Sequence, residues 1–239
     1  MVHGSGALDR DETIYDNKPF SDIAEELAAR GIATLRYDKR TFVYHQSVTT
    51  MDEETIHDAL SAIRLARRYS NHVFLLGHSL GAMLAPLIAE RMEEATLTGV
   101  IMMAAPARDL EVVVREQFDY LLPSGASPAY KEQQIENLRH RSPHYLQPQG
   151  QTAAAQHLMI PMLILQGERD YQVTLQDFRL WQQLLKGKSN VVFHSYPALN
   201  HIFMEGDGKS TPLEYQRKGH VAMYVINDVA AFIRQSVKK

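Results

Sequence analysis

The stretch VFLLGHSLG, residues 73–81, decides how this chain is interpreted. Its first four residues are apolar and predict a short buried strand, and the apolar spacing after Gly81 predicts a helix over residues 82–92. Between strand and helix lies the pattern G-x-S-x-G. A serine at such a turn has its hydroxyl held clear of the backbone, and the two glycines let neighbouring elements approach closely. The stretch therefore predicts that Ser79 is a nucleophile.

Strands and helices alternate on both sides of this stretch. A chain with that alternation folds into a mainly parallel sheet with helices on both faces. The apolar patterns predict further strands at residues 32–37, 98–103, 162–166 and 191–196, and further helices at residues 19–28, 56–66, 175–185 and 221–233.

The alternation stops between residues 107 and 157. Two amphipathic patterns, at residues 110–121 and 130–138, are separated and bounded by prolines and one glycine. We interpret residues 107–157 as a helical cap inserted into an α/β core formed by residues 1–106 and 158–239.

A serine hydroxyl needs a base within hydrogen-bond reach, and the base needs a carboxylate that orients it. After a strand–turn–helix serine, the acid is expected next along the chain and the base after it, both beyond the carboxyl ends of strands. The loop GERD follows the predicted strand at residues 162–166 and contains Glu168 and Asp170. Asp170 is the expected acid, and Glu168 is its competitor, with a solvated loop charge paired with Arg169 as the alternative role of Glu168.

The base is expected after the last strand, where the sequence reads PALNHIF at residues 197–203. His201 lies in this loop and is the expected base. His194 falls inside the predicted strand and His220 at the start of the predicted last helix, so both are better explained by structure.

A tetrahedral intermediate needs two backbone N–H donors directed at its oxyanion. One comes from the residue after the nucleophile, which is Leu80, and the other from an early loop. The segment His3-Gly4-Ser5-Gly6 is the expected early loop, with the Ser5 N–H as donor, although a terminal HGSG could also be the remnant of an expression tag.

Composition excludes several other classes of protein. The 239 residues carry a net charge of −3 without long charge blocks, which argues against a nucleic-acid surface, and the apolar runs are too short for a membrane span. The absence of cysteine excludes thiolate metal sites and disulfides. His140 and His144 are separated by Pro143, so a shared metal-binding face is not expected, and we predict no metal and no cofactor. The segment RYDKR, residues 36–40, is expected to be a salt-bridged loop end, with a substrate-facing role as the alternative.

With these motifs in place, the chain resembles the α/β-hydrolase superfamily over nearly its whole length, and within it bacterial serine esterases of the dienelactone-hydrolase-like branch. HGSG, DRDET, NKPF, RYDKR, GHSLG, GERDYQV and LNHIF occur in the order typical of that group. The resemblance implies hydrolysis of carboxylic esters through an acyl-enzyme on Ser79, without a cofactor. Dienelactone hydrolases themselves use a cysteine nucleophile, which this chain does not have.

One departure from the family concerns the sheet. In the family a central strand leads into the HG loop, with other strands before it, whereas here only Met1 and Val2 precede His3. Unpaired strand edges inside a protein would leave backbone donors and acceptors without partners. We therefore expect either missing N-terminal strands, a rearranged segment, or a homo-oligomer whose partner completes the sheet. No signal peptide is visible and the expected location is cytoplasmic, although a missing N-terminal segment could have carried an export signal.

The sequence-based prediction is a serine hydrolase acting on small-molecule esters with short to medium acyl chains. The same residues would also serve a thioesterase, an acyltransferase or a peptidase, or remain in an inactive ligand-binding module. Candidate residues for the acyl pocket, each of which could equally pack in the core, are Met83, Phe118, Tyr120, Leu121 and Phe203.

Overall fold

A parallel sheet organises the molecule. The computed structural model describes residues 1–45, 48–92, 96–122, 127–147 and 149–238. Within them, four parallel strands lie side by side in chain order. These strands are β1 (Phe74–His78), β2 (Gly99–Met103), β3 (Met162–Gly167) and β4 (Val191–Tyr196). Four of the five predicted strands are therefore confirmed, with small changes at their ends.

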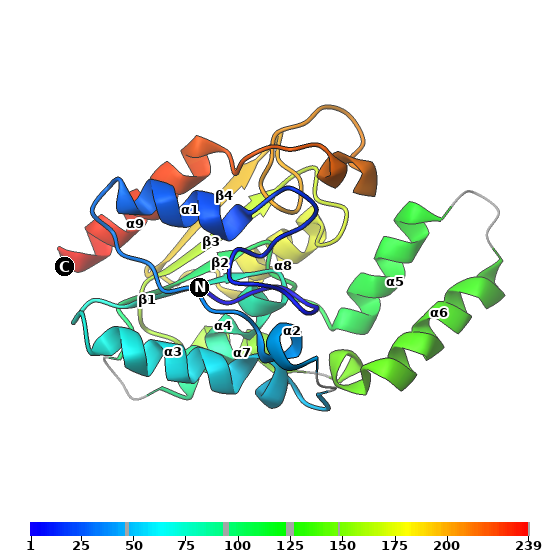
Figure 1. The fold of residues 1–239 in the computed structure, drawn as a ribbon, viewed down its shortest axis with the longest axis horizontal. Coiled ribbons are helices and arrows are strands. Elements are labelled where there is room, and N and C mark those ends of the chain that lie inside the picture. The colour runs from blue at the N-terminus through cyan, green and yellow to red at the C-terminus, as the bar shows by residue number, and fades with distance from the viewer. Residues whose placement is uncertain (46–47, 93–95, 123–126, 148, 239) are drawn as a thin grey trace.

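Helices cover both faces of the sheet, as the alternating pattern predicts (Figure 1). On one face lie α1 (Pro19–Ala28) and α9 (Met223–Val237). On the other lie α3 (His57–Arg67), α4 (Leu80–Glu90), α7 (Gln151–His157) and α8 (Leu175–Leu184). Alternate residues of β2 feed the two cores: Val100 and Met102 pack toward α4, while Ile101 and Met103 pack toward α1 and α9. Every residue of β2 is buried, as expected for an inner strand of a doubly covered sheet.

Two helix boundaries differ from the prediction in ways that matter for the site. The helix predicted from residue 82 begins at Leu80, directly after Ser79. The last helix begins at Met223 and not at residue 221, so His220 precedes it, and its Nδ1 lies 2.9 Å from Asp22 Oδ1.

The prediction of a strand at residues 32–37 is wrong. This segment is extended but carries no strand pairing. The Met1 amino group donates to Leu35 O at 2.8 Å, and Val2 forms a single parallel bridge to Gly77 at the edge of β1.

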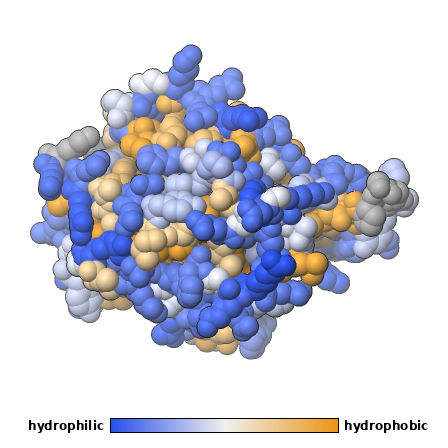
Figure 2. Space-filling model, turned by 90° about the horizontal axis from the view of Figure 1, so that it is seen from above, coloured by the Kyte–Doolittle hydropathy of each residue, from blue (hydrophilic) through white to orange (hydrophobic). Residues whose placement is uncertain are grey.

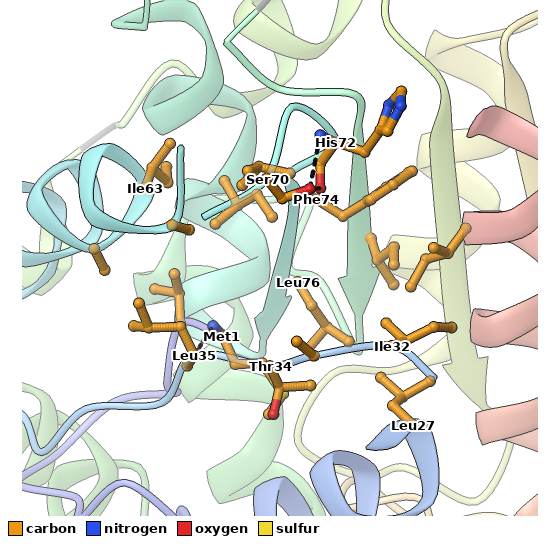
Figure 3. A pocket seen from close by; sticks show the side chains of 18 of the residues that line it. Met1, Leu27, Ile32, Thr34, Leu35, Ile63, Ser70, His72, Phe74 and Leu76 are labelled. Carbon is orange, nitrogen blue, oxygen red and sulfur yellow. Dashed lines mark hydrogen bonds between the residues drawn. The ribbon is translucent and has the colours of Figure 1, made fainter. Parts of the chain in front are cut away.

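A cavity of about 440 Å³ lies between this extended segment and β1, where the sequence suggests that a central strand is lacking (Figure 3). Its walls are mainly apolar and come from the 32–37 segment, α3, β1 and the end of α1, with side chains such as Leu27, Ile63 and Leu76. Apart from the contacts of Met1 and Val2, the cavity therefore separates β1 from the extended segment, and no paired strand lies between them in the described part of the chain.

The segment between β2 and β3 contains α5 (Leu110–Leu121), α6 (Pro128–Arg141), the 3₁₀ turn η2 (Pro143–Leu146) and α7. Ser127 caps α6 by accepting a hydrogen bond from the Tyr130 N–H, and Pro128 occupies the first turn. Helices α5 and α6 project beyond the sheet, whereas α7 packs against α4 and α8 (Figure 1).

Figure 2 shows apolar surface on the projecting part, interrupted by hydrophilic side chains. Exposed apolar side chains of α5 and α6 are Val112, Leu121 and Tyr130.

The remaining short elements are α2 (Arg40–Tyr44), the π-helical turn η1 (Asp52–Ile56) that leads into α3, and the 3₁₀ turn η3 (Pro212–Gln216). Among the described residues, no helix combines the length and apolar character needed to span a membrane.

Candidate active site

The turn at Ser79 has the strained geometry that the G-x-S-x-G pattern predicts. Ser79 adopts φ 52° and ψ −117°, a conformation that non-glycine residues rarely take. A Cβ on Gly77 would overlap the Gly81 carbonyl group, and a Cβ on Gly81 would overlap the Val2 and His3 carbonyl oxygens. Only glycine permits these approaches, so the two glycines allow β1, α4 and the N-terminal segment to meet around the serine.

The residues expected to be the acid and the base are in direct contact. His201 Nδ1 lies 2.7 Å from Asp170 Oδ2, and both side chains are buried. Asp170 Oδ1 accepts hydrogen bonds from the backbone N–H groups of Gln172 and Val173, at 2.7 and 3.0 Å. These bonds fix the carboxylate, so its other oxygen can orient the imidazole and leave the second ring nitrogen free to serve as a base.

The competitor Glu168 has a different partner. Its Oε1 accepts a hydrogen bond from the Ser195 hydroxyl at 2.7 Å on an exposed part of the loop. Arg169, considered above as a partner of Glu168, pairs instead with Glu214. Of the two carboxylates, the structure places only Asp170 against His201.

His201 lies beside the serine turn. Its backbone oxygen is 2.9 Å from His78 Nε2, and the rings of His78 and His201 are 4.8 Å apart between centroids. His78 directly precedes Ser79, and residues 79, 170 and 201 follow the carboxyl ends of β1, β3 and β4. This is the edge at which parallel α/β sheets hold their sites. Among the described residues a hydrogen bond joins the side chains of Asp170 and His201, but none joins those of Ser79 and His201.

The early HGSG loop lies next to the same serine. A Cβ built on Gly4 would be 3.2 Å from the Ser79 Cβ, and Ser5 is exposed. The Gly4 N–H donates to Glu12 Oε1 at 2.6 Å. Leu80 is the first residue of α4, so its N–H has no acceptor within the helix.

Glu12 is a site residue that the sequence analysis did not single out. It is buried, and its Oε2 lies 3.0 Å from His78 Nδ1. Burial alone would lower the pKa of His78, but the Glu12 carboxylate outweighs it and the pKa is raised. Burial would likewise raise the pKa of Glu12, and the His78 charge lowers it below its ordinary value. This buried pair links the HGSG loop to the serine turn.

Lys39 and Glu54 form a second buried pair that was not predicted. Their side chains are 2% and 3% exposed, and Lys39 Nζ lies 2.8 Å from Glu54 Oε1. The other charges of segment 36–40 pair as expected of a salt-bridged loop end, with Asp38 against Arg10 and Arg40 against Asp58. Composition carries no signal for which of these neighbouring cations is buried, because burial depends on the packing of distant segments.

The candidate residues for the acyl pocket differ in how far their side chains are buried. Met83 and Phe203 are completely buried in the hydrophobic cores, and Phe118 is half-buried on α5. Tyr120 stacks on Tyr171 with ring centroids 5.1 Å apart, and Leu121 is exposed.

His140 and His144, the two histidines weighed above as metal ligands, lie in different surroundings. His144 Nε2 lies 3.0 Å from Glu54 Oε2 in the interior, whereas His140 is exposed near Glu136. Within the described part of the chain, no group of three or more His, Asp or Glu side chains is arranged to hold a metal ion.

Comparison with known proteins gives the same fold. Residues 1–215 match the model of the alpha/beta hydrolase family. The chain belongs to the alpha/beta hydrolase family. The dienelactone-hydrolase-like branch is not tested by this match and stays a prediction.

One curated relative of this family member is Esterase EstD from Thermotoga maritima. The two are 42% identical over 253 residues, an alignment that covers 98% of the chain and 61% of the relative. The chain thus spans about three fifths of that protein's length.

Solved structures share the fold at low sequence identity. Esterase Pf2001 from Pyrococcus furiosus has a TM-score of 0.65 at 15% identity, covering 98% of this chain and 79% of that one. Est1E from Butyrivibrio proteoclasticus, solved with ferulic acid, has a TM-score of 0.67 at 17% identity, covering 100% and 88% of the two chains.

Proposed function

We propose that this chain is a serine carboxylic-ester hydrolase that works through an acyl-enzyme on Ser79. The observation that carries the proposal is the buried Asp170–His201 pair, with 2.7 Å between its atoms, beside a strained serine turn. The relative that shares 42% of its residues with the chain is named an esterase, which supports the same reaction.

In the proposed reaction the Ser79 hydroxyl oxygen attacks the ester carbonyl carbon while His201 Nε2 takes the hydroxyl proton. Asp170 holds the imidazole through Nδ1 and stabilises the imidazolium. The N–H groups of Leu80 and Ser5 donate to the oxyanion. His201 then returns the proton to the leaving alcohol, and a water activated by the same base hydrolyses the acyl-enzyme.

Labelling with a fluorophosphonate probe tests this proposal most directly. We expect the wild-type chain to be labelled and to hydrolyse p-nitrophenyl esters, and Ser79→Ala to lose both properties while keeping its fold by circular dichroism. Near-normal turnover by the folded Ser79→Ala variant would contradict the assignment. A panel of thioesters, peptides and acyl acceptors separates the alternative reactions that use the same residues.

The proposal includes residues 107–157 as a cap that limits the acyl chain to short or medium length. Its support is the projection of α5 and α6 beyond the sheet, together with the half-buried Phe118 and Tyr120 on α5 (Figure 1). Replacing residues 110–145 by a short linker should broaden the chain-length preference. An unchanged preference in a folded variant would remove the cap from the proposal.

Two further parts of the proposal concern assembly and location. A second copy of the chain could supply a strand beside β1 and so fill the 440 Å³ cavity. This is supported by the free edge of β1, which within the described residues carries only the bridge to Val2. Light scattering on the purified chain tests this, and a strict monomer contradicts it. The cytoplasmic location also remains a proposal and is tested by cell fractionation.

A further inference from the structure

The HGSG loop is held by a buried ion pair and a tyrosine hydroxyl that come from three different parts of the chain. Lys39 Nζ donates to Gly4 O at 3.0 Å and lies 2.8 Å from Glu54 Oε1. Glu54 in turn accepts a hydrogen bond from the Tyr145 hydroxyl at 2.6 Å. The loop is therefore connected through two buried charges to η2, which belongs to the segment between β2 and β3.

The bond from Lys39 sets the orientation of one particular peptide group. Gly4 C=O and Ser5 N–H belong to the same peptide unit, which is planar and trans, so the two groups point in opposite directions. With the carbonyl held by an interior ammonium, the Ser5 N–H is directed away from Lys39. If this peptide unit turned over, the carbonyl oxygen would replace the donor.

Several neighbouring groups fix the position of the Lys39–Glu54 ion pair. Burial by itself would raise the pKa of Glu54, but the Lys39 ammonium outweighs it, and the pKa lies below its ordinary value. Two more groups bind the Glu54 carboxylate: the Tyr145 hydroxyl donates to Oε1, and His144 Nε2 lies 3.0 Å from Oε2. A carboxylate with this many partners in the interior has one well-defined position.

Tyr145 also touches the loop directly. Its hydroxyl accepts a hydrogen bond from the Gly6 N–H at 3.3 Å while it donates to Glu54. The 3₁₀ turn between α6 and α7 thus contacts the HGSG loop both directly and through the ion pair.

We propose that Lys39, Glu54 and Tyr145 are positioning residues that hold the Gly4–Ser5 peptide with its N–H toward the reacting ester, and so couple the cap segment to the oxyanion hole. This inference rests on the proposed esterase function. It assigns no contact with substrate to these three residues. They act only through the orientation of the loop.

The main test removes the pair without leaving an unpaired charge in the interior. In the double variant Lys39→Met/Glu54→Leu, apolar residues of similar volume replace both charges, a change that often leaves stability nearly unaltered. We expect kcat for p-nitrophenyl butyrate to fall about 10- to 100-fold, somewhat less than the loss of an oxyanion donor itself, with KM nearly unchanged. A trifluoromethyl ketone, which forms a tetrahedral oxyanion adduct with the serine, should lose affinity by the same factor as kcat/KM.

The matched control is Arg40→Met/Asp58→Leu. Arg40 follows Lys39 in the chain and pairs with Asp58 of α3, with Arg40 Nε donating to Asp58 Oδ2 at 2.9 Å. Within the described ranges of the chain, no hydrogen bond joins either side chain to the HGSG loop. We expect this variant to keep its kcat and its affinity for the ketone. Equal losses in both double variants, or an unchanged kcat in a folded Lys39→Met/Glu54→Leu variant, would overturn the proposal.

A milder variant decides the question if the first does not fold. Tyr145→Phe removes only the hydroxyl that bonds Glu54 and the Gly6 N–H, and we expect kcat to fall about three- to tenfold at unchanged KM. An unchanged kcat would overturn the inference in that case. Failure of the esterase proposal itself is distinguishable, because the wild-type chain would then neither react with the fluorophosphonate nor bind the ketone.

Discussion

The two halves of the candidate site are built in different ways. Asp170 and His201, the expected acid and base, follow β3 and β4; Asp170 is fixed by local bonds from the N–H groups two and three residues later, and His201 is held by Asp170 and, through its backbone oxygen, by His78. The HGSG loop depends instead on Glu12, Lys39 and Tyr145, which contact it across separations of up to 139 residues. In the first half the carboxylate is therefore fixed within its own loop, whereas the HGSG loop depends on buried side chains from several distant segments.

This contrast predicts different kinds of failure. A change in the acid–base half should remove the chemistry while leaving the loop intact. A change around the loop should leave nucleophile and base in place but weaken the stabilisation of the oxyanion. The following predictions test that difference, beginning with the largest effect.

Asp170→Asn should lower kcat about 10³- to 10⁴-fold, because an amide cannot hold His201 in the tautomer that a base requires. Steady-state kinetics with p-nitrophenyl esters measure this. Glu168→Gln is the control, since Glu168 bonds Ser195 and not His201, and it should stay within about twofold of wild type, as surface changes of this kind cost little. Similar losses in the two variants would mean that the acid is misassigned.

Gly81→Ala should disturb the contact between the N-terminal segment and the serine turn. The added Cβ would overlap the Val2 and His3 carbonyl oxygens, so the N-terminal segment must move away from α4. Overpacking of this kind destabilises by about 1–3 kcal/mol, measurable by urea denaturation. Gly187→Ala provides a surface comparison, because its Cβ would meet no atom within 4 Å, although its φ of 86° adds some strain. Equal stability of Gly81→Ala and wild type would refute the close contact at the serine turn.

Glu12→Gln should lower kcat about tenfold with little change in KM, because the Gly4 N–H and His78 lose a charged partner of the kind worth about 1.5–3 kcal/mol. Asp11→Asn is a matched control, since Asp11 pairs with Lys18 and Arg36 outside the loop. If KM rose and kcat did not change, Glu12 would belong to substrate binding and not to the oxyanion half.

The Glu12–His78 pair should also give a small pH dependence of stability. The pKa of Glu12 is lowered from 4.5, so its contribution is complete above pH 4.5 and is lost as the pH falls through the folded-state value. The pKa of His78 is raised from 6.5, so its contribution is complete below pH 6.5 and is lost as the pH rises through the folded-state value.

The free energy of unfolding of wild type should therefore exceed that of Glu12→Gln most between pH 4.5 and 6.5, by on the order of 1–2 kcal/mol. Urea titrations across pH 4–9 measure the difference. A constant difference over that range would show that the two charges are not linked to folding.

Much of the acid–base half could be predicted because its signals are local. The apolar run before Gly77, the two glycines and the order of Ser79, Asp170 and His201 along the chain require no knowledge of distant contacts. The structure places Asp170, and not Glu168, against His201, and the role of Asp170 as the acid stays a prediction. The prediction of a strand at residues 32–37 was wrong because a mainly apolar segment becomes a strand only where a neighbouring strand pairs with it.

By itself, then, the amino-acid sequence determined the alternation of strands and helices, the serine turn and the loops that contain Asp170 and His201. These features follow from the spacing of apolar residues and from the backbone freedom of glycine, and both act over only a few residues. Only the tertiary structure decided which charges are buried, since Lys39 and Arg40 are neighbours with the same charge, yet one is 2% exposed and the other 34%. That difference arises where segments far apart in the chain pack together, and there Lys39 meets Gly4 O and Glu54.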